Sequence, residues 1–86
     1  MVSYDRIPEK MRRGARLYVE AGKLPGGFLQ AVLRDSLTET YGKADDENKE
    51  AIESYVMWLY NDIPAGCWDS QKKINDWVNQ GGLNGK

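Results

Sequence analysis

The chain has no histidine, a single cysteine and no long apolar run. Histidine is the commonest general base and the commonest metal ligand, so its absence excludes most hydrolase sites and most metal centres. Cys67 cannot form an internal disulfide, which small secreted domains ordinarily use to strengthen a thin core. No stretch approaches the roughly 20 apolar residues that span a bilayer, and residues 1–6 contain no apolar signal segment. We therefore expect a cytoplasmic protein without a membrane partner.

The composition nevertheless supports one folded domain. Of the 86 residues, 41 % are hydrophobic, and three Trp and five Tyr supply large rings for a core. A domain this small buries a limited share of its surface, so oligomerisation would stabilise it. Residues 1–43 hold eight Lys and Arg against five Asp and Glu, whereas residues 44–86 hold four against eight. This asymmetry is compatible with an anion site on the first half or with a head-to-tail contact between subunits.

Apolar residues at helical spacing predict an all-α fold, a compact bundle of about four short helices without strands. The expected helices cover residues 7–21, residues 28–41, residues 44–62 with a buried stripe of Ile52, Tyr55, Val56 and Leu59, and a last segment capped by Asp69 or Ser70. Gly14 inside the first helix indicates a close approach by another backbone. We expect a single domain over residues 1–86, with an ordered core over about 7–80 and a frayed tail over 81–86.

A glycine-rich loop before the second helix is a candidate anion site. Lys23 precedes Gly26 and Gly27, and the helix opens at Phe28. Free amides at a helix start bind anions, and two glycines let a ligand approach the backbone. The alternative is an ordinary tight turn between antiparallel helices, which the same residues favour.

Basic and aromatic residues complete the candidate sites. Arg12 and Arg16 lie one helical turn apart and, with Lys23 and Arg34, suit phosphate or carboxylate recognition, although a solvated and self-paired surface explains part of this set. Large rings gather in the last third, and we expect at least one of Trp58, Tyr60 and Trp68 to contact a partner subunit or a ligand.

No residue pattern indicates catalysis. Cys67 lacks a nearby base or cation that would lower the pKa of its thiol, so we expect a small buried residue. The carboxylates of residues 45–50 lack the spacing of a calcium loop and suit a helix start better. We predict a protein that is not an enzyme and uses no metal and no cofactor.

Several segments resemble a widespread family of small phage and prophage proteins of no established activity. The resemblance covers about residues 7–78 and is carried by residues 25–33 (PGGFLQAVL), by Ala44, Asp45 and Asn48, by residues 58–61 (WLYN), and by Pro64 with residues 67–70 (CWDS). Asp69 stands where the family usually has glycine. The resemblance implies a phage accessory protein that acts in the host bacterial cell.

Three functional hypotheses follow. The first is a counter-defence protein that sequesters a small nucleotide immune signal as a homo-oligomer, a molecular sponge with arginines and helix amides on the phosphates and aromatic rings on the bases. The second is an inhibitor whose aromatic surface docks on a host defence protein. The third is a helix-turn-helix regulator, which the neutral-to-acidic charge disfavours because nucleic acid binding relies on phosphate neutralisation.

Overall fold

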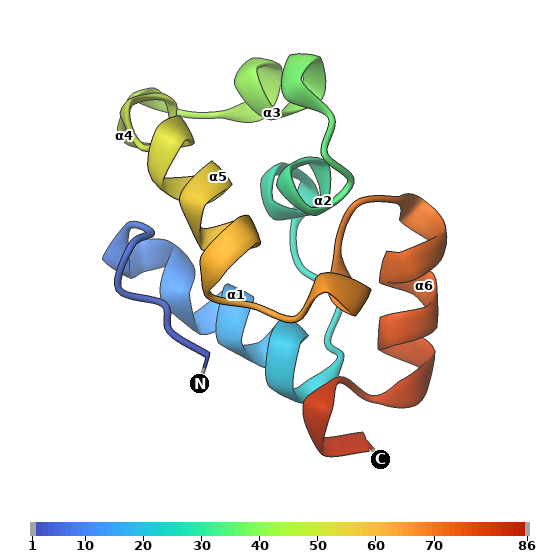
Figure 1. The fold of residues 1–86 in the computed structure, drawn as a ribbon. Coiled ribbons are helices and arrows are strands. Elements are labelled where there is room, and N and C mark those ends of the chain that lie inside the picture. Colours follow the sequence, from blue (N-terminus) through green and yellow to red (C-terminus); the bar gives the residue numbers. More distant parts are fainter. Residues whose placement is uncertain (1, 86) are drawn as a thin grey trace.

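The computed structural model describes residues 2–85 and shows an all-α chain (Figure 1). Its elements are α1 (Glu9–Ala21), α2 (Gly27–Leu33), α3 (Leu37–Lys43), α4 (Asp46–Glu50), α5 (Ile52–Asn61), the 3-10 turn η1 (Ala65–Cys67), α6 (Gln71–Gln80) and the 3-10 turn η2 (Leu83–Gly85). The fold class predicted from sequence is confirmed, with six α-helices in place of about four. None of these helices is long and apolar enough to cross a membrane.

The first and last helices follow their sequence signals. Helix α1 begins directly after Pro8 and ends at Gly22, which adopts the left-handed φ of 72°. In α6 the side chain of Ser70 accepts a hydrogen bond from the Lys73 amide at 3.2 Å, and Gly81 ends the helix at a φ of 85°. Of the two proposed caps, Ser70 is therefore the one used.

The second and third expected helices are each divided. Residues 28–41 form α2 and α3, because Asp35 adopts a φ of 63° and ends the helical path. Aspartate tolerates this conformation better than most residues. Residues 44–62 form α4 and α5 around Ala51, and Asp45 caps α4 by accepting from the Asn48 amide at 2.9 Å. Asn48 on α4 is buried and accepts a hydrogen bond from the Tyr55 hydroxyl on α5 at 2.8 Å.

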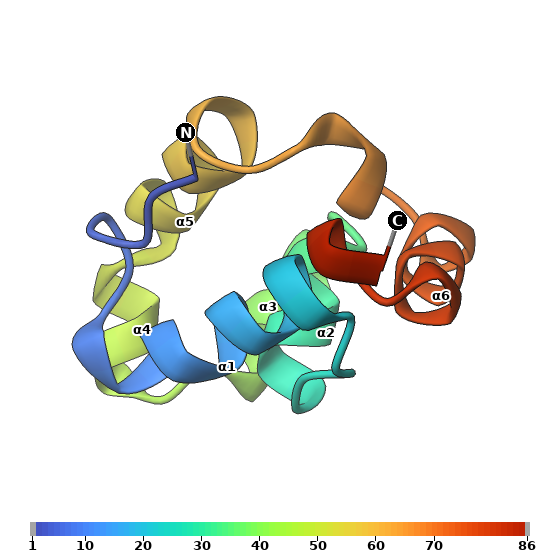
Figure 2. The same cartoon turned by 90° about the horizontal axis from the view of Figure 1, so that it is seen from below.

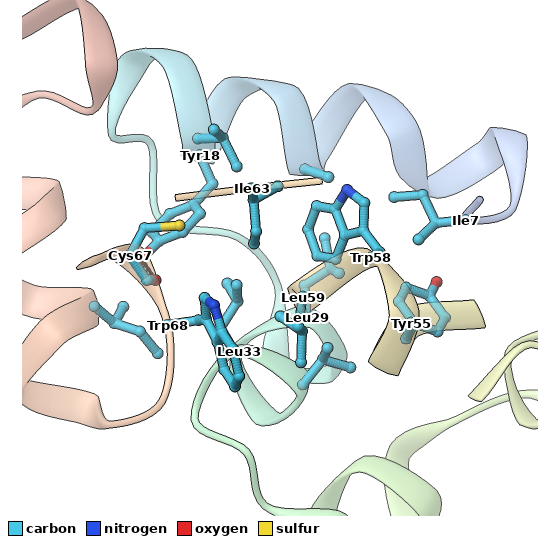
Figure 3. Close-up of a cluster of buried hydrophobic side chains, with 14 of the residues drawn as sticks. Ile7, Tyr18, Leu29, Leu33, Tyr55, Trp58, Leu59, Ile63, Cys67 and Trp68 are labelled. Atoms are coloured by element: carbon cyan, nitrogen blue, oxygen red, sulfur yellow. Dashed lines mark hydrogen bonds between the residues drawn. The ribbon is translucent and has the colours of Figure 1, made fainter. Parts of the chain in front are cut away.

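The core lies between α1, α2, α5, η1 and α6, and Figure 3 shows a close-up of it. Tyr18, Tyr55 and Trp58 are its largest fully buried side chains. The N-terminal segment closes one side: the indole N–H of Trp58 donates to the Ser3 carbonyl at 2.9 Å, and Ile7 is buried. In Figure 1, α2 lies between α5 and α6, and α3 follows it at one end of the molecule.

Two glycines join the ends of α1 and α6. A Cβ atom on Gly82 would lie 2.6 Å from the Gly22 nitrogen, so only glycine permits this approach. The close backbone contact expected at Gly14 is therefore found here instead, since Gly14 faces only the Leu29 side chain, 3.7 Å from its Cβ position. Within the tail that was expected to fray, Leu83–Gly85 form η2 against α1 (Figure 2), and Lys86 lies outside the described residues.

Candidate functional site

The glycine loop, residues 23–27, connects α1 to α2 and is fixed by two hydrogen bonds. The Lys23 amide donates to the Leu17 carbonyl at 3.2 Å, and the Gln30 side-chain amide donates to the Pro25 carbonyl at 2.8 Å. Gly26 has no atom within 4 Å of its Cβ position. The loop is therefore held in one shape, while its backbone at Gly26 stays open to solvent.

Lys43 reaches this loop from the far end of α3. A Cβ atom on Gly27 would lie 3.7 Å from both the Cδ and the Nζ atoms of Lys43. Lys23 and Lys43 are exposed, and neither forms an ion pair within residues 2–85. Sequence reasoning missed Lys43, because only the fold of α3 onto α2 brings it near Gly27. We define the lysine cluster as Lys43, which lies beside Gly27, together with Lys23, which belongs to the glycine loop itself.

The two arginines expected at the ligand site serve the N-terminal segment instead. Arg12 donates to the carbonyl oxygens of Asp5 and Ile7, both at 3.1 Å. The guanidinium of Arg16 lies 4.8 Å from the ring centroid of Tyr4, and an open depression of about 400 Å³ adjoins this pair. Their cations therefore hold residues 4–7 against α1.

Arg34 and Phe28 are also occupied by structural contacts. Arg34 donates to Glu39 at 2.8 Å and to the Gln71 side chain at 2.9 Å, and the hydrogen bond from Arg34 lowers the pKa of Glu39. The half-buried Phe28 ring meets the Tyr55 ring edge-on, with centroids 5.2 Å apart. The residues predicted to bind a ligand therefore do not form one site. Arg12 and Arg16 contact the N-terminal segment, Arg34 and Phe28 contact other helices, and the remaining three belong to the glycine loop. Residues 28–41, the recognition helix of the DNA-binding hypothesis, are divided between α2 and α3.

Of the three aromatic candidates, only Tyr60 is exposed. Trp58 is fully buried and Trp68 is 9 % exposed, so both belong to the core, whereas Tyr60 is 72 % exposed. The Tyr60 ring packs edge-on against Trp68, with centroids 5.3 Å apart. Of these three rings, Tyr60 is therefore the one whose exposure leaves it free to contact a partner subunit or a ligand.

Exposed apolar side chains form a second candidate surface. The α3–α5 patch is defined as Leu37, Val56, Met57 and Tyr60, which are 72, 44, 42 and 72 % exposed. Val56 and Tyr60 lie one turn apart on α5, and Leu37 and Val56 both line a groove of about 50 Å³ above Tyr55 and Leu59. Val56 was expected in the buried stripe; the core instead takes Trp58, since α5 turns that side of the helix inward.

Cys67 is a buried structural residue, as expected. Its thiol donates to the Pro64 carbonyl at 3.1 Å, and burial raises the pKa of the Cys67 thiol to about 12. The Cys67 carbonyl accepts a hydrogen bond from the Tyr18 hydroxyl at 2.6 Å. Within residues 2–85, no three carboxylate or thiol side chains gather into a set that could hold a metal ion.

Comparison of the chain with models of protein families, with curated proteins and with solved structures found no match. The geometry of the lysine cluster and of the α3–α5 patch therefore carries the functional argument.

Proposed function

We propose that the protein is a non-enzymatic phage accessory protein of counter-defence, which binds a small nucleotide signal as an oligomer and withholds it from the host. The supporting observation is the lysine cluster at the glycine loop. Of the cations in residues 2–85, Arg13, Lys23 and Lys43 have no carboxylate, carbonyl or aromatic partner. Lys43 lies beside Gly27, and Lys23 belongs to the same glycine loop.

This arrangement suits a phosphate group. A phosphate requires positive charge and N–H donors, and a backbone without a side chain lets it approach closely. Lys23 and Lys43 supply the charge, Gly26 leaves the approach open, and the hydrogen bond from Gln30 to Pro25 holds the loop in shape before binding. Because the loop is already ordered by these contacts, little ordering entropy is lost when an anion binds.

The test is a calorimetric titration with a panel of mono-, di- and cyclic dinucleotides. For a nucleotide that binds, Lys43→Gln removes one charge-assisted contact of about 1.5–3 kcal/mol, so the Kd should rise about 10- to 100-fold. Lys72→Gln is the matched control, because Lys72 lies on α6, pairs with Asp76 and is 85 % exposed. If no member of the panel binds, or if the two variants bind equally well, the nucleotide proposal is wrong.

The α3–α5 patch favours a second candidate, an inhibitor that docks on a host defence protein. Exposed apolar residues of this size are typical anchors of protein interfaces. A pull-down from host lysate with the wild type and with Leu37→Glu compares this candidate with the first. A host protein that is retained by the wild type and lost with the variant would favour inhibition.

A further inference from the structure

A second exposed apolar group lies around the C-terminal end of α1. The C-terminal patch is defined as Leu17, Leu24 and Leu83, which are 39, 56 and 41 % exposed. The hydrogen bond from the Lys23 amide to the Leu17 carbonyl holds the loop that carries Leu24 against α1. The contact of Gly82 with Gly22 brings the following residue, Leu83, to the same end of the helix.

The two patches carry opposite charge at their edges. Asp35 lines the groove of the α3–α5 patch, and Glu53 precedes Val56 and Met57 by one turn of α5. Neither carboxylate forms an ion pair within the part of the chain that the structure describes. At the C-terminal patch, the exposed cation Arg13 lies one turn before Leu17 and is likewise without an ion pair among residues 2–85.

Figure 1 shows α3, which carries Leu37, at one end of the molecule and the C-terminal end of α1 with η2 at the other. Helix α5, which carries the rest of the α3–α5 patch, extends from α4 toward α1. One copy therefore cannot bring its own patches together, whereas two copies can. We propose that the α3–α5 patch of one copy docks on the C-terminal patch of a second copy, in a head-to-tail contact.

Charge decides between this contact and a symmetric one. If two α3–α5 patches faced each other, Asp35 and Glu53 of one copy would face the same carboxylates of the other, and like charges in an interface are unfavourable. The head-to-tail contact instead places Arg13 near carboxylates. The groove of about 50 Å³ exceeds the roughly 10–15 Å³ that one water needs, so it has room for the tip of an apolar side chain.

The experiment measures the mass of the full chain, without nucleotide, by sedimentation and native mass spectrometry. Leu37→Glu alters the first patch and Leu24→Glu the second, and both side chains are more than half exposed, so folding should be retained. Each variant alone should be monomeric, with its dissociation constant raised at least about tenfold. Asn79→Glu, at an exposed position of α6, is the matched control and should assemble like the wild type.

A mixture of the two variants is decisive. In a head-to-tail contact, the intact C-terminal patch of Leu37→Glu fits the intact α3–α5 patch of Leu24→Glu, so the mixture should form a dimer and no larger species. A symmetric contact would leave one variant assembled by itself. A monomeric wild type, a variant that assembles alone, or a mixture that stays monomeric would each overturn the proposal. The contact rests on the oligomer of the proposed function, but because no nucleotide is present, its failure is distinguished from a failure of nucleotide binding in the ligand titration.

Discussion

Asp69 adopts a φ of 104°, a backbone conformation that glycine reaches freely and other residues rarely adopt. The Asp69 amide donates to the Leu33 carbonyl at 2.7 Å, which ties the turn before α6 to the end of α2 and maintains this conformation. We therefore predict that Asp69→Gly stabilises the protein.

The magnitude follows from three contributions. Relief of the backbone strain contributes about 1–3 kcal/mol. The greater freedom of glycine in the unfolded chain removes about 0.4–1 kcal/mol. Loss of the exposed ion pair with Lys73, at 3.8 Å, costs about 0.3 kcal/mol. The net gain is about 1 kcal/mol, which should raise the Tm of a domain of this size by about 4–8 °C.

Thermal unfolding followed by circular dichroism measures this gain, and Asp69→Ala is the control. Alanine removes the same carboxylate but keeps the strain, so it should be no more stable than the wild type. The strain argument is refuted if the glycine variant melts at or below the alanine variant.

Three further predictions concern the free energy of unfolding of other variants and its dependence on pH. Gly82→Ala should lower the free energy of unfolding, measured by chemical denaturation, by at least about 2 kcal/mol, because Gly82 has a φ of 71° and its new Cβ would meet the Gly22 backbone. Gly66→Ala, which has open space around its Cβ, should stay within about 0.5 kcal/mol of the wild type. Trp58→Phe should lower the free energy of unfolding by about 1–2 kcal/mol more than Trp68→Phe. The first change leaves the Ser3 carbonyl without its hydrogen-bond donor, whereas the buried indole nitrogen of Trp68 has no partner to lose. Equal losses of stability would contradict this. Burial raises the pKa of the Cys67 thiol from 9.0 to about 12, so this thiol loses its proton at a lower pH in the unfolded chain than in the folded one. The free energy of unfolding should therefore fall between about pH 9 and 12. A Tm that does not change across that range would exclude this effect.

Much of the candidate site was not predictable from local sequence. Lys23, Gly26 and Gly27 are neighbours along the chain, and their loop was identified because glycine and proline mark turns wherever they occur. Lys43 is distant in sequence, and its place beside Gly27 depends on the left-handed Asp35 that reverses the chain between α2 and α3. Arg12 and Arg16 have the chemistry of an anion site, but hydrogen bonds to the N-terminal segment and a stacked ring engage them, and no local pattern reports such partners.

The sequence by itself determined the helical fold class, the end of α1 near residue 21, the start of α6 at Asp69 or Ser70 and the burial of Cys67. These features depend on residues within about one helical turn of each other, where spacing, capping and glycine conformation act directly. The tertiary structure alone decided that Trp58 is buried while Val56 and Tyr60 are exposed, and that Gly22 meets Gly82. A helix with apolar residues on most sides can bury any of its faces, and the choice depends on which face the neighbouring helices and the N-terminal segment cover.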